Sequence, residues 1–172
     1  RDYKVTGVQT CALPISISFS IPESVVREPL LAQKRSHLVS PIVPGYPYAF
    51  TDHGDYLSTY SRGFFAVTHR KAGWDCFRHL EILASGAAPL MIDVDDIPPY
   101  CMVHYPKETL KNILARACEG GVPSHDTYTH LHAFLQAHLT TRSLAHYALT
   151  CTSIEDVGRV LFVDEQHPKA VD

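Results

Sequence analysis

Two short apolar runs separated by one helical segment constrain the fold more than any other feature of this sequence. The runs are GFFAVT at residues 63–68 and APLMI at residues 88–92, and each has the length of a buried strand. Residues 75–85 carry apolar side chains at helical spacing, with Asp75 as the expected N-cap and Gly86 as the residue that closes the helix. The order strand, helix, strand is typical of a βαβ unit. The sequence therefore predicts an α/β domain built on a parallel sheet.

The flanking segments extend this unit into a Rossmann-like three-layer domain with a parallel sheet. The other expected elements are a strand at residues 17–21, a short helix opened by Pro22 and Glu23, an edge strand or extended loop at 37–43, a turn at 44–47, a helix at 52–62 capped by Asp52, helices at 107–119 and 124–138, a helix capped by Thr140 or Thr141 that runs through Leu149, and a strand at 159–163. We expect the domain to span residues 17–152. Residues 153–172 are expected to begin a further α/β unit that is cut short.

The first residues differ in origin from the rest. The run VTGVQTCALPI at residues 5–15 resembles the in-frame translation of a common sequencing-library adapter. It lacks the charged and apolar regions of a signal peptide. We therefore interpret residues 1–16 as a non-native leader that stands in place of the native N-terminus.

Composition argues against several classes of partner. The chain of 172 residues has a formal net charge of -3, which gives no indication of a nucleic-acid partner. No apolar run approaches the roughly 20 residues that a membrane-spanning helix needs, so no membrane segment is expected. The five cysteines contain no CxxC pair, and we interpret them as reduced thiols. A cytoplasmic location is favoured, although the leader hides the native N-terminus.

A basic loop follows the first of the two strands, where α/β sheets bind ligands. The loop, HRKAGW at residues 69–74, carries Arg70 and Lys71 and runs into the start of a helix. Free N–H groups at a helix N-terminus favour phosphate, and Arg78 in the first turn can fork onto a diphosphate. Glu81 lies three residues later on the same face, where its carboxylate can accept hydrogen bonds from ribose hydroxyls. The segment is thus expected to bind a nucleotide.

A longer pattern includes this segment. Its parts are the aromatic pair Phe64 and Phe65, the basic loop, Arg78, Glu81, and the SGAAPL return at residues 85–90. The pattern resembles the donor-binding region of GT-B glycosyltransferases, most closely the exostosin-like group. Weaker similarities at Pro44-Gly45, at Asp55-Tyr56, at Thr140-Thr141 and in the late LFV run extend the resemblance over most of residues 17–164. The resemblance implies that the chain is one half of a GT-B enzyme, in which Arg78 and Glu81 hold the phosphates and the sugar of the donor.

The loop and the resemblance together predict a site and a reaction. The expected donor-binding residues are Arg70, Lys71, Arg78, Glu81 and Gly86, with no metal and no cofactor, since the nucleotide sugar is a substrate. The expected reaction transfers the sugar to an acceptor glycan or another hydroxyl compound. The base would come from a second Rossmann-like domain that this chain lacks, and no catalytic residue is assigned. The chain alone is expected to bind the donor weakly and not to turn over.

Several of these residues have simpler interpretations. Arg78 and Glu81 could form an ordinary i,i+3 surface salt pair, and Trp74 could pack in the core instead of stacking on a base. Arg70 and Lys71 could belong to a solvated loop. Asp75 at the helix cap would place a negative charge near the phosphate site.

Other side chains suggest metal or nucleophile chemistry only weakly. Asp93, Asp95 and Asp96 resemble a cation cluster after the second strand, but GT-B enzymes as a class do not depend on a metal. His130 and His132 are two residues apart and so point to different sides of a helix. The remaining candidates, each lacking a partner pattern, are His69 directly after the first strand and Cys76 near a helix N-terminus.

The main alternative function is a non-catalytic α/β module that binds a nucleotide or a sugar phosphate. Both this module and the transferase predict that Arg78 and Glu81 converge on one cleft. A receiver-like or hydrolase domain would need an acidic triad or a nucleophile elbow, and the sequence contains no GxSxG motif.

Overall fold

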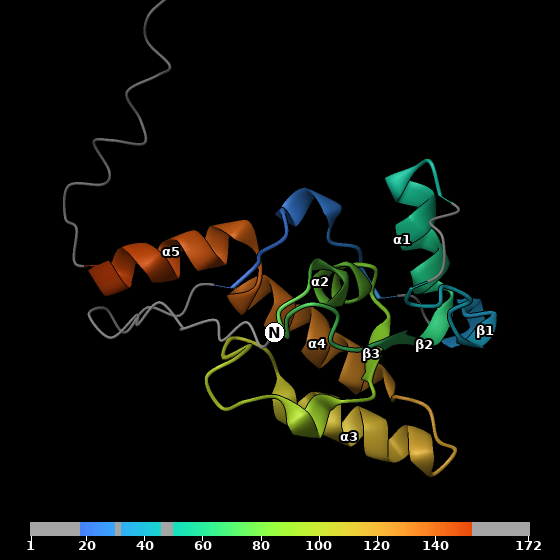
Figure 1. Cartoon of the computed structure of the whole chain (residues 1–172). Helices are drawn as coiled ribbons and strands as arrows, with labels where there is room; N and C mark the ends of the chain where they lie inside the picture. Colours follow the sequence, from blue (N-terminus) through green and yellow to red (C-terminus); the bar gives the residue numbers. More distant parts are fainter. Residues whose placement is uncertain (1–17, 30–31, 46–49, 153–172) are drawn as a thin grey trace, which may run out of the picture. The chain divides into compact units, whose positions relative to one another are not determined.

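The computed structural model describes residues 18–29, 32–45 and 50–152 (Figure 1). The chain divides into two compact units, Ser18–Leu144 and a second unit made of Arg1–Ile17 with Ala145–Asp172. The described part of the second unit is residues 145–152, the end of a helix. Several expectations fall outside the described residues. They are the predicted leader at residues 1–16, part of the predicted turn at 46–47, the predicted strand at 159–163 and the expected further unit at 153–172.

Three strands form one parallel sheet in the order β1 (His37–Val39), β2 (Gly63–Thr68), β3 (Ala88–Met91). Thr68 pairs with Met91, so β2 and β3 end level with each other at their carboxyl ends. This confirms the α/β class and the parallel sheet. The first strand is an edge strand, as expected, but it is shorter than residues 37–43, because Pro41 has no N–H group to continue the ladder.

Helices α1 (His53–Ser61) and α2 (Phe77–Ala84) connect the strands. The predicted cap of α1 is confirmed, since Oδ1 of Asp52 accepts a hydrogen bond of 2.8 Å from the amide of Asp55. Gly86 ends α2 as expected, with a φ of 78° that favours glycine. Both helices run from the carboxyl edge of the sheet back to its amino edge, as in any βαβ unit.

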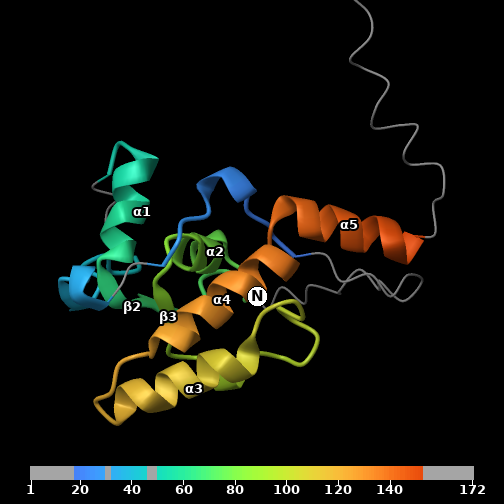
Figure 2. The same ribbon diagram turned by 180° about the vertical axis from the view of Figure 1, so that it is seen from behind.

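Three further helices follow the sheet: α3 (Lys107–Cys118), α4 (His125–His138) and α5 (Thr141–Thr152). All three were expected, and the Oγ of Ser124 caps α4 by accepting from the amide of Thr127 at 3.2 Å. In both views α1 and α3 lie on opposite sides of the strands (Figures 1 and 2). Short 3-10 helices occur at Glu23–Val25, Ala32–Lys34 and Val94–Asp96.

The core consists of two groups of buried side chains. The larger group joins the sheet to α2, α3 and α4, and the smaller one packs α1 against the sheet and α2. Phe65 belongs to the larger group and its neighbour Ala66 to the smaller one. The two faces of β2 are therefore both covered, which explains why this strand has a continuous apolar sequence.

The predicted cap of α2 is wrong. The helix begins at Phe77, and Cys76 occupies the N-cap position without a side-chain hydrogen bond. The Asp75 carboxylate instead accepts from the amide of Phe19 at 2.9 Å and from the hydroxyl of Tyr105 at 3.2 Å. Because both partners are distant in sequence, the local pattern of a capping aspartate gave no sign of them.

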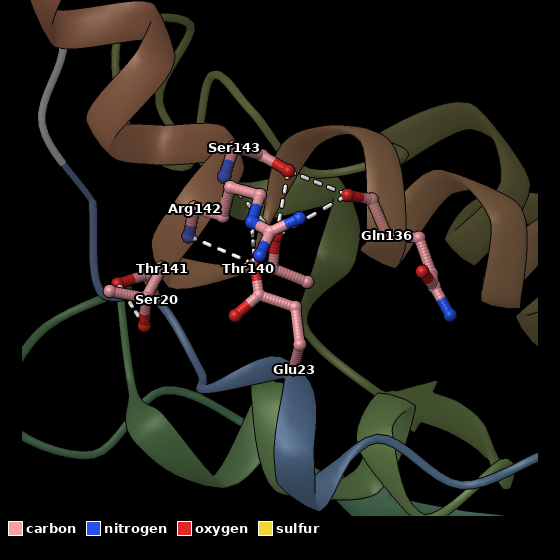
Figure 3. Close-up of polar contacts among 7 residues, drawn as sticks. All are labelled: Ser20, Glu23, Gln136, Thr140, Thr141, Arg142 and Ser143. Atoms are coloured by element: carbon pink, nitrogen blue, oxygen red, sulfur yellow. Dashed lines mark hydrogen bonds and ion pairs between the residues drawn. The ribbon is translucent and has the colours of Figure 1, made fainter.

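Residues 17–21 do not form the expected strand within the described part of the chain. Ile21 makes an isolated parallel bridge with Thr140, at the start of α5. Thr140 caps this helix, since its Oγ1 accepts from the amide of Ser143 at 3.2 Å. Glu23 accepts from the amide of Arg142 at 3.1 Å, so the short helix after Pro22 is tied to the same junction (Figure 3).

Arg35 lies at the amino edge of the sheet and is buried. Its guanidinium donates to the carbonyl oxygens of Ser61, Gly63 and Gly86 at 3.1, 2.6 and 2.9 Å. These groups belong to the end of α1, the start of β2 and the end of α2. The cation therefore neutralises the negative ends of two helix dipoles at once. The ring of Tyr128 in α4 lies 4.0 Å from the guanidinium carbon.

Candidate functional site

A pocket of about 440 Å³ lies at the carboxyl edge of the sheet. It is lined by Arg70 and Trp74 from the loop after β2, and by Asp93, Asp96 and Pro98 from the segment after β3. Loops at the carboxyl ends of parallel strands are where α/β folds bind ligands. Of the five residues predicted to bind the donor, Arg70 lines this pocket, and Lys71, Arg78, Glu81 and Gly86 do not.

Two contacts of Arg70 shape this pocket. Its guanidinium carbon lies 4.9 Å from the centre of the Trp74 ring, a cation–π contact. Its amide donates to Oδ2 of Asp93 at 2.8 Å and so joins the two loops. The other oxygen of Asp93, Oδ1, is shielded from solvent and has no hydrogen-bond partner among the described residues. The hydrogen-bonding capacity of this carboxylate is therefore only partly used by the protein.

His79 holds the loop after β2 in place through a hydrogen bond to the backbone of Trp74. The carbonyl of Trp74 can only accept, so Nε2 of His79 carries the proton that is donated to it at 3.1 Å. The Thr68 hydroxyl then donates to Nδ1 at 2.8 Å. Burial lowers the pKa of His79, which favours this neutral form. Sequence reasoning missed His79, because a histidine inside an apolar helix resembles any other core residue.

Asp75 and Tyr105 fix the next residue of the same loop. The tyrosine hydroxyl donates to the carboxylate, and burial raises the pKa of Tyr105 above its ordinary value, so the hydroxyl keeps its proton. The ring of Tyr105 also meets the ring of His79 edge to face, with centres 6.2 Å apart. The backbone at Trp74 is therefore held in place at two points, through its own carbonyl and through the side chain of Asp75.

The predicted cations remain available at this edge. Lys71 is exposed, Arg78 is partly exposed in the first turn of α2, and neither side chain makes a hydrogen bond or ion pair with the described residues. Asp75 does not cap α2, since its oxygens accept from Phe19 and Tyr105, so its side chain does not occupy the amides at the start of the helix. Both cations can therefore turn toward an anion at the helix N-terminus.

The Glu81 carboxylate contacts α1 and forms no ion pair with Arg78 in the described part of the chain. The carboxylate is buried against α1, where Oε2 accepts from the hydroxyl of Tyr56 at 3.1 Å and Oε1 lies 3.5 Å from Nε2 of His53. The two residues share a helix and lie in different surroundings.

Gly86 lies at the opposite end of α2 from the pocket. Its carbonyl accepts from Arg35, and a Cβ at this position would come within 2.9 Å of the Cα of Pro29. The structure thus gives Gly86 a role in closing the helix against the preceding segment.

Asp93 and Asp96 line the pocket, whereas Asp95 pairs with Lys111 at 3.6 Å. Within residues 18–29, 32–45 and 50–152, no group of three or more His, Cys, Asp or Glu side chains is placed to hold a metal ion. In the same part of the chain, no helix has the length and apolar character needed to cross a bilayer.

Comparison of the chain with protein-family models, with curated proteins and with solved structures gives no match.

Proposed function

We propose that this chain is the donor-binding part of a glycosyltransferase, which transfers a sugar from a nucleotide sugar to an acceptor hydroxyl. The observation that carries the proposal is the pocket at the carboxyl edge of the sheet, where Arg70 and Trp74 meet two carboxylates. An aromatic ring with a few convergent polar groups is typical of small-molecule sites. The GT-B resemblance of the surrounding sequence is the second support.

The diphosphate of the donor would lie between the pocket and the start of α2. Arg70, Lys71 and Arg78 supply three cations there, and the first turn of the helix has no side-chain cap. Free N–H groups and arginine forks both favour phosphate oxygens. Sugar transfer leaves negative charge on the departing diphosphate, so the same groups would stabilise the transition state. The second domain of a GT-B enzyme would supply the acceptor and the base.

A non-catalytic nucleotide- or sugar-phosphate-binding module is the second candidate. One observation favours it: the Glu81 carboxylate is already engaged by Tyr56 and His53. A carboxylate held in this way is less available to the hydroxyls of a donor. The module would use Arg70, Lys71 and Arg78 in the same manner and would perform no transfer.

The proposal is tested by titrating the chain with UDP and with GDP. Trp74 is the only tryptophan of the sequence, so its fluorescence reports directly on the pocket. We expect saturable quenching that Arg78→Ala and Arg70→Ala weaken by about tenfold each, the effect of losing one charged hydrogen bond. Arg62→Ala is the matched control, because this exposed arginine follows α1 at the amino edge of the sheet.

The outcomes separate the candidates. A folded chain that binds neither UDP nor GDP contradicts both candidate functions. Binding that Glu81→Gln weakens favours the transferase donor site, and binding that this substitution leaves unchanged favours the non-catalytic module. Measurable transfer by the chain alone would contradict the expectation that a second domain is needed.

A further inference from the structure

We propose that the pocket lined by Arg70, Trp74, Asp93 and Asp96 is a carbohydrate subsite, which binds a sugar ring through Trp74 and the two carboxylates. This inference rests on the proposed function and names the part of the donor that enters the pocket. The base and the phosphates of the nucleotide would then lie outside it.

The charges of the residues that line the pocket indicate what kind of ligand it can hold. Among the described residues that line the pocket, Asp93 and Asp96 contribute two carboxylates and Arg70 contributes the one cation. A diphosphate inside the pocket would therefore meet a net repulsion, whereas Lys71 and Arg78 lie outside the lining. The occupant that fits these charges is neutral and polar.

The two carboxylates of the pocket require a ligand that donates hydrogen bonds. Ionised carboxylates only accept hydrogen bonds, so their ligand must be rich in donors. Within the described residues, the exposed Asp96 accepts no hydrogen bond from a side chain, whereas Asp93 keeps an unpartnered oxygen that is shielded from solvent, so Asp96 is the acceptor that a ligand meets first. A sugar ring presents several hydroxyl donors on neighbouring carbons, whereas a nucleobase presents one or two. Two carboxylates in one small pocket match the sugar better.

The ring of Trp74 offers an aromatic surface on which a sugar ring can stack. Trp74 packs partly against the core, and the Arg70 guanidinium covers its ring at 4.9 Å. Arg70 is exposed, and a cation–π contact at an exposed site is weak. The apolar face of a sugar ring can displace the guanidinium and stack in its place. The freed guanidinium can then turn toward the phosphates. Because His79 holds the Trp74 backbone, the ring needs little reorganisation to accept the sugar.

The experiment titrates the full chain with D-glucose, D-galactose, D-mannose and N-acetyl-D-glucosamine, each up to high millimolar concentration. Saturation-transfer NMR detects the bound sugar, and Trp74 fluorescence reports on stacking. We expect at least one of these sugars to bind. Asp96→Asn and Trp74→Phe should each weaken this sugar by about tenfold or more, because each removes one of the few contacts of a small ligand.

A matched pair of variants makes the test specific. Asp95 is next to Asp96 in sequence but pairs with Lys111 and lies outside the lining, so Asp95→Asn should leave sugar binding unchanged. Arg70→Ala should raise the affinity for the free sugar, because it uncovers the Trp74 ring. The same substitution should weaken UDP or GDP, because it removes a phosphate ligand.

The possible failures are distinguishable. If a nucleotide binds and none of the four sugars does, the inference is overturned and the proposed function stands. Sugar binding that Asp95→Asn and Asp96→Asn affect equally also overturns the inference. A sugar that binds through Asp96 in a chain that ignores both nucleotides keeps the carbohydrate site and overturns the donor-binding function. Competition of uridine or guanosine for the Trp74 ring, without any effect of Asp96→Asn, would assign the pocket to the base.

Discussion

Replacing Arg35 with methionine is expected to destabilise the fold more than replacing any exposed arginine. Methionine keeps much of the apolar stem and removes the guanidinium. Three carbonyl oxygens, at Ser61, Gly63 and Gly86, then lose their donor. These groups end α1, begin β2 and end α2, so one substitution affects every layer of the βαβ unit.

The magnitude follows from opposing contributions. A buried acceptor left without a partner costs about 1–3 kcal/mol. Three acceptors would give several kcal/mol, but water can reach some of them after the change. Burial also lowers the pKa of Arg35, which shows that the charged form loses hydration in the fold, and removing a buried charge recovers part of that cost. We therefore expect a net loss of about 3 kcal/mol. This is a large share of the roughly 5–15 kcal/mol that stabilise an ordinary domain.

Urea unfolding, followed by Trp74 fluorescence and by far-UV circular dichroism, measures this loss. With a urea dependence of about 1–3 kcal/mol/M, a loss of about 3 kcal/mol should lower the midpoint by roughly 1–3 M. Arg62→Met is the control, because Arg62 is exposed and its side chain has no partner among the described residues. Arg35→Lys keeps the charge but cannot span three carbonyls, so it should fall between the two. A loss below about 0.5 kcal/mol for Arg35→Met, typical of a surface change, would refute the reasoning.

Two further predictions concern stability. The folded pKa of His79 lies below its ordinary value of 6.5, so the unfolded chain binds more protons as the pH falls through that value. Its contribution to stability is complete above about pH 6.5 and is lost progressively below it. In urea unfolding between pH 5 and 8, His79→Gln should therefore show a smaller loss at low pH than the natural chain; parallel curves would contradict this. Gly86→Ala should cost about 1–3 kcal/mol more than Gly120→Ala. Both glycines have a φ near 77° (78° and 76°), but only at Gly86 would the new Cβ meet backbone, at 2.9 Å. Equal thermal shifts for the two would contradict the packing argument.

The elements with local signals could be predicted from the sequence. Asp52 and Ser124 cap helices through amides three residues later, which is a pattern that a single short segment contains. The strand Gly63–Thr68 was located to the residue because it is apolar throughout and bounded by glycine and a basic loop.

The errors came from contacts between distant segments. Asp75 looks like a helix cap, but its oxygens are taken by Phe19 and Tyr105, which lie 56 and 30 residues away. The role of Arg35 has no sequence signal, since its partners are backbone carbonyls that any sequence possesses. Long-range hydrogen bonds to the backbone leave no pattern in a sequence.

In the candidate site, too, local patterns could be predicted from the sequence and long-range contacts could not. Arg70 and Trp74 can be recognised from the sequence, because a basic, aromatic loop directly after a parallel strand lies where α/β sheets bind ligands. Glu81 was interpreted from its distance to Arg78 on one helix, and helical spacing does not reveal that Tyr56 and His53 of α1 engage the carboxylate. The residues that hold the loop in place, such as His79, show no recognisable sequence pattern, because only the fold brings them to the loop.

The separation between Arg35 and the pocket has a consequence for how this protein could change over evolution or in the laboratory. The guanidinium joins helix ends at the amino edge of the sheet, whereas the pocket is made of loop residues at the carboxyl edge. Substitutions at Arg70, Lys71 or Asp96 can therefore alter ligand preference without loosening the packing of α1 and α2. A library that randomises these exposed positions and keeps Arg35, Trp74 and His79 would explore new specificities on a scaffold whose stability stays nearly constant.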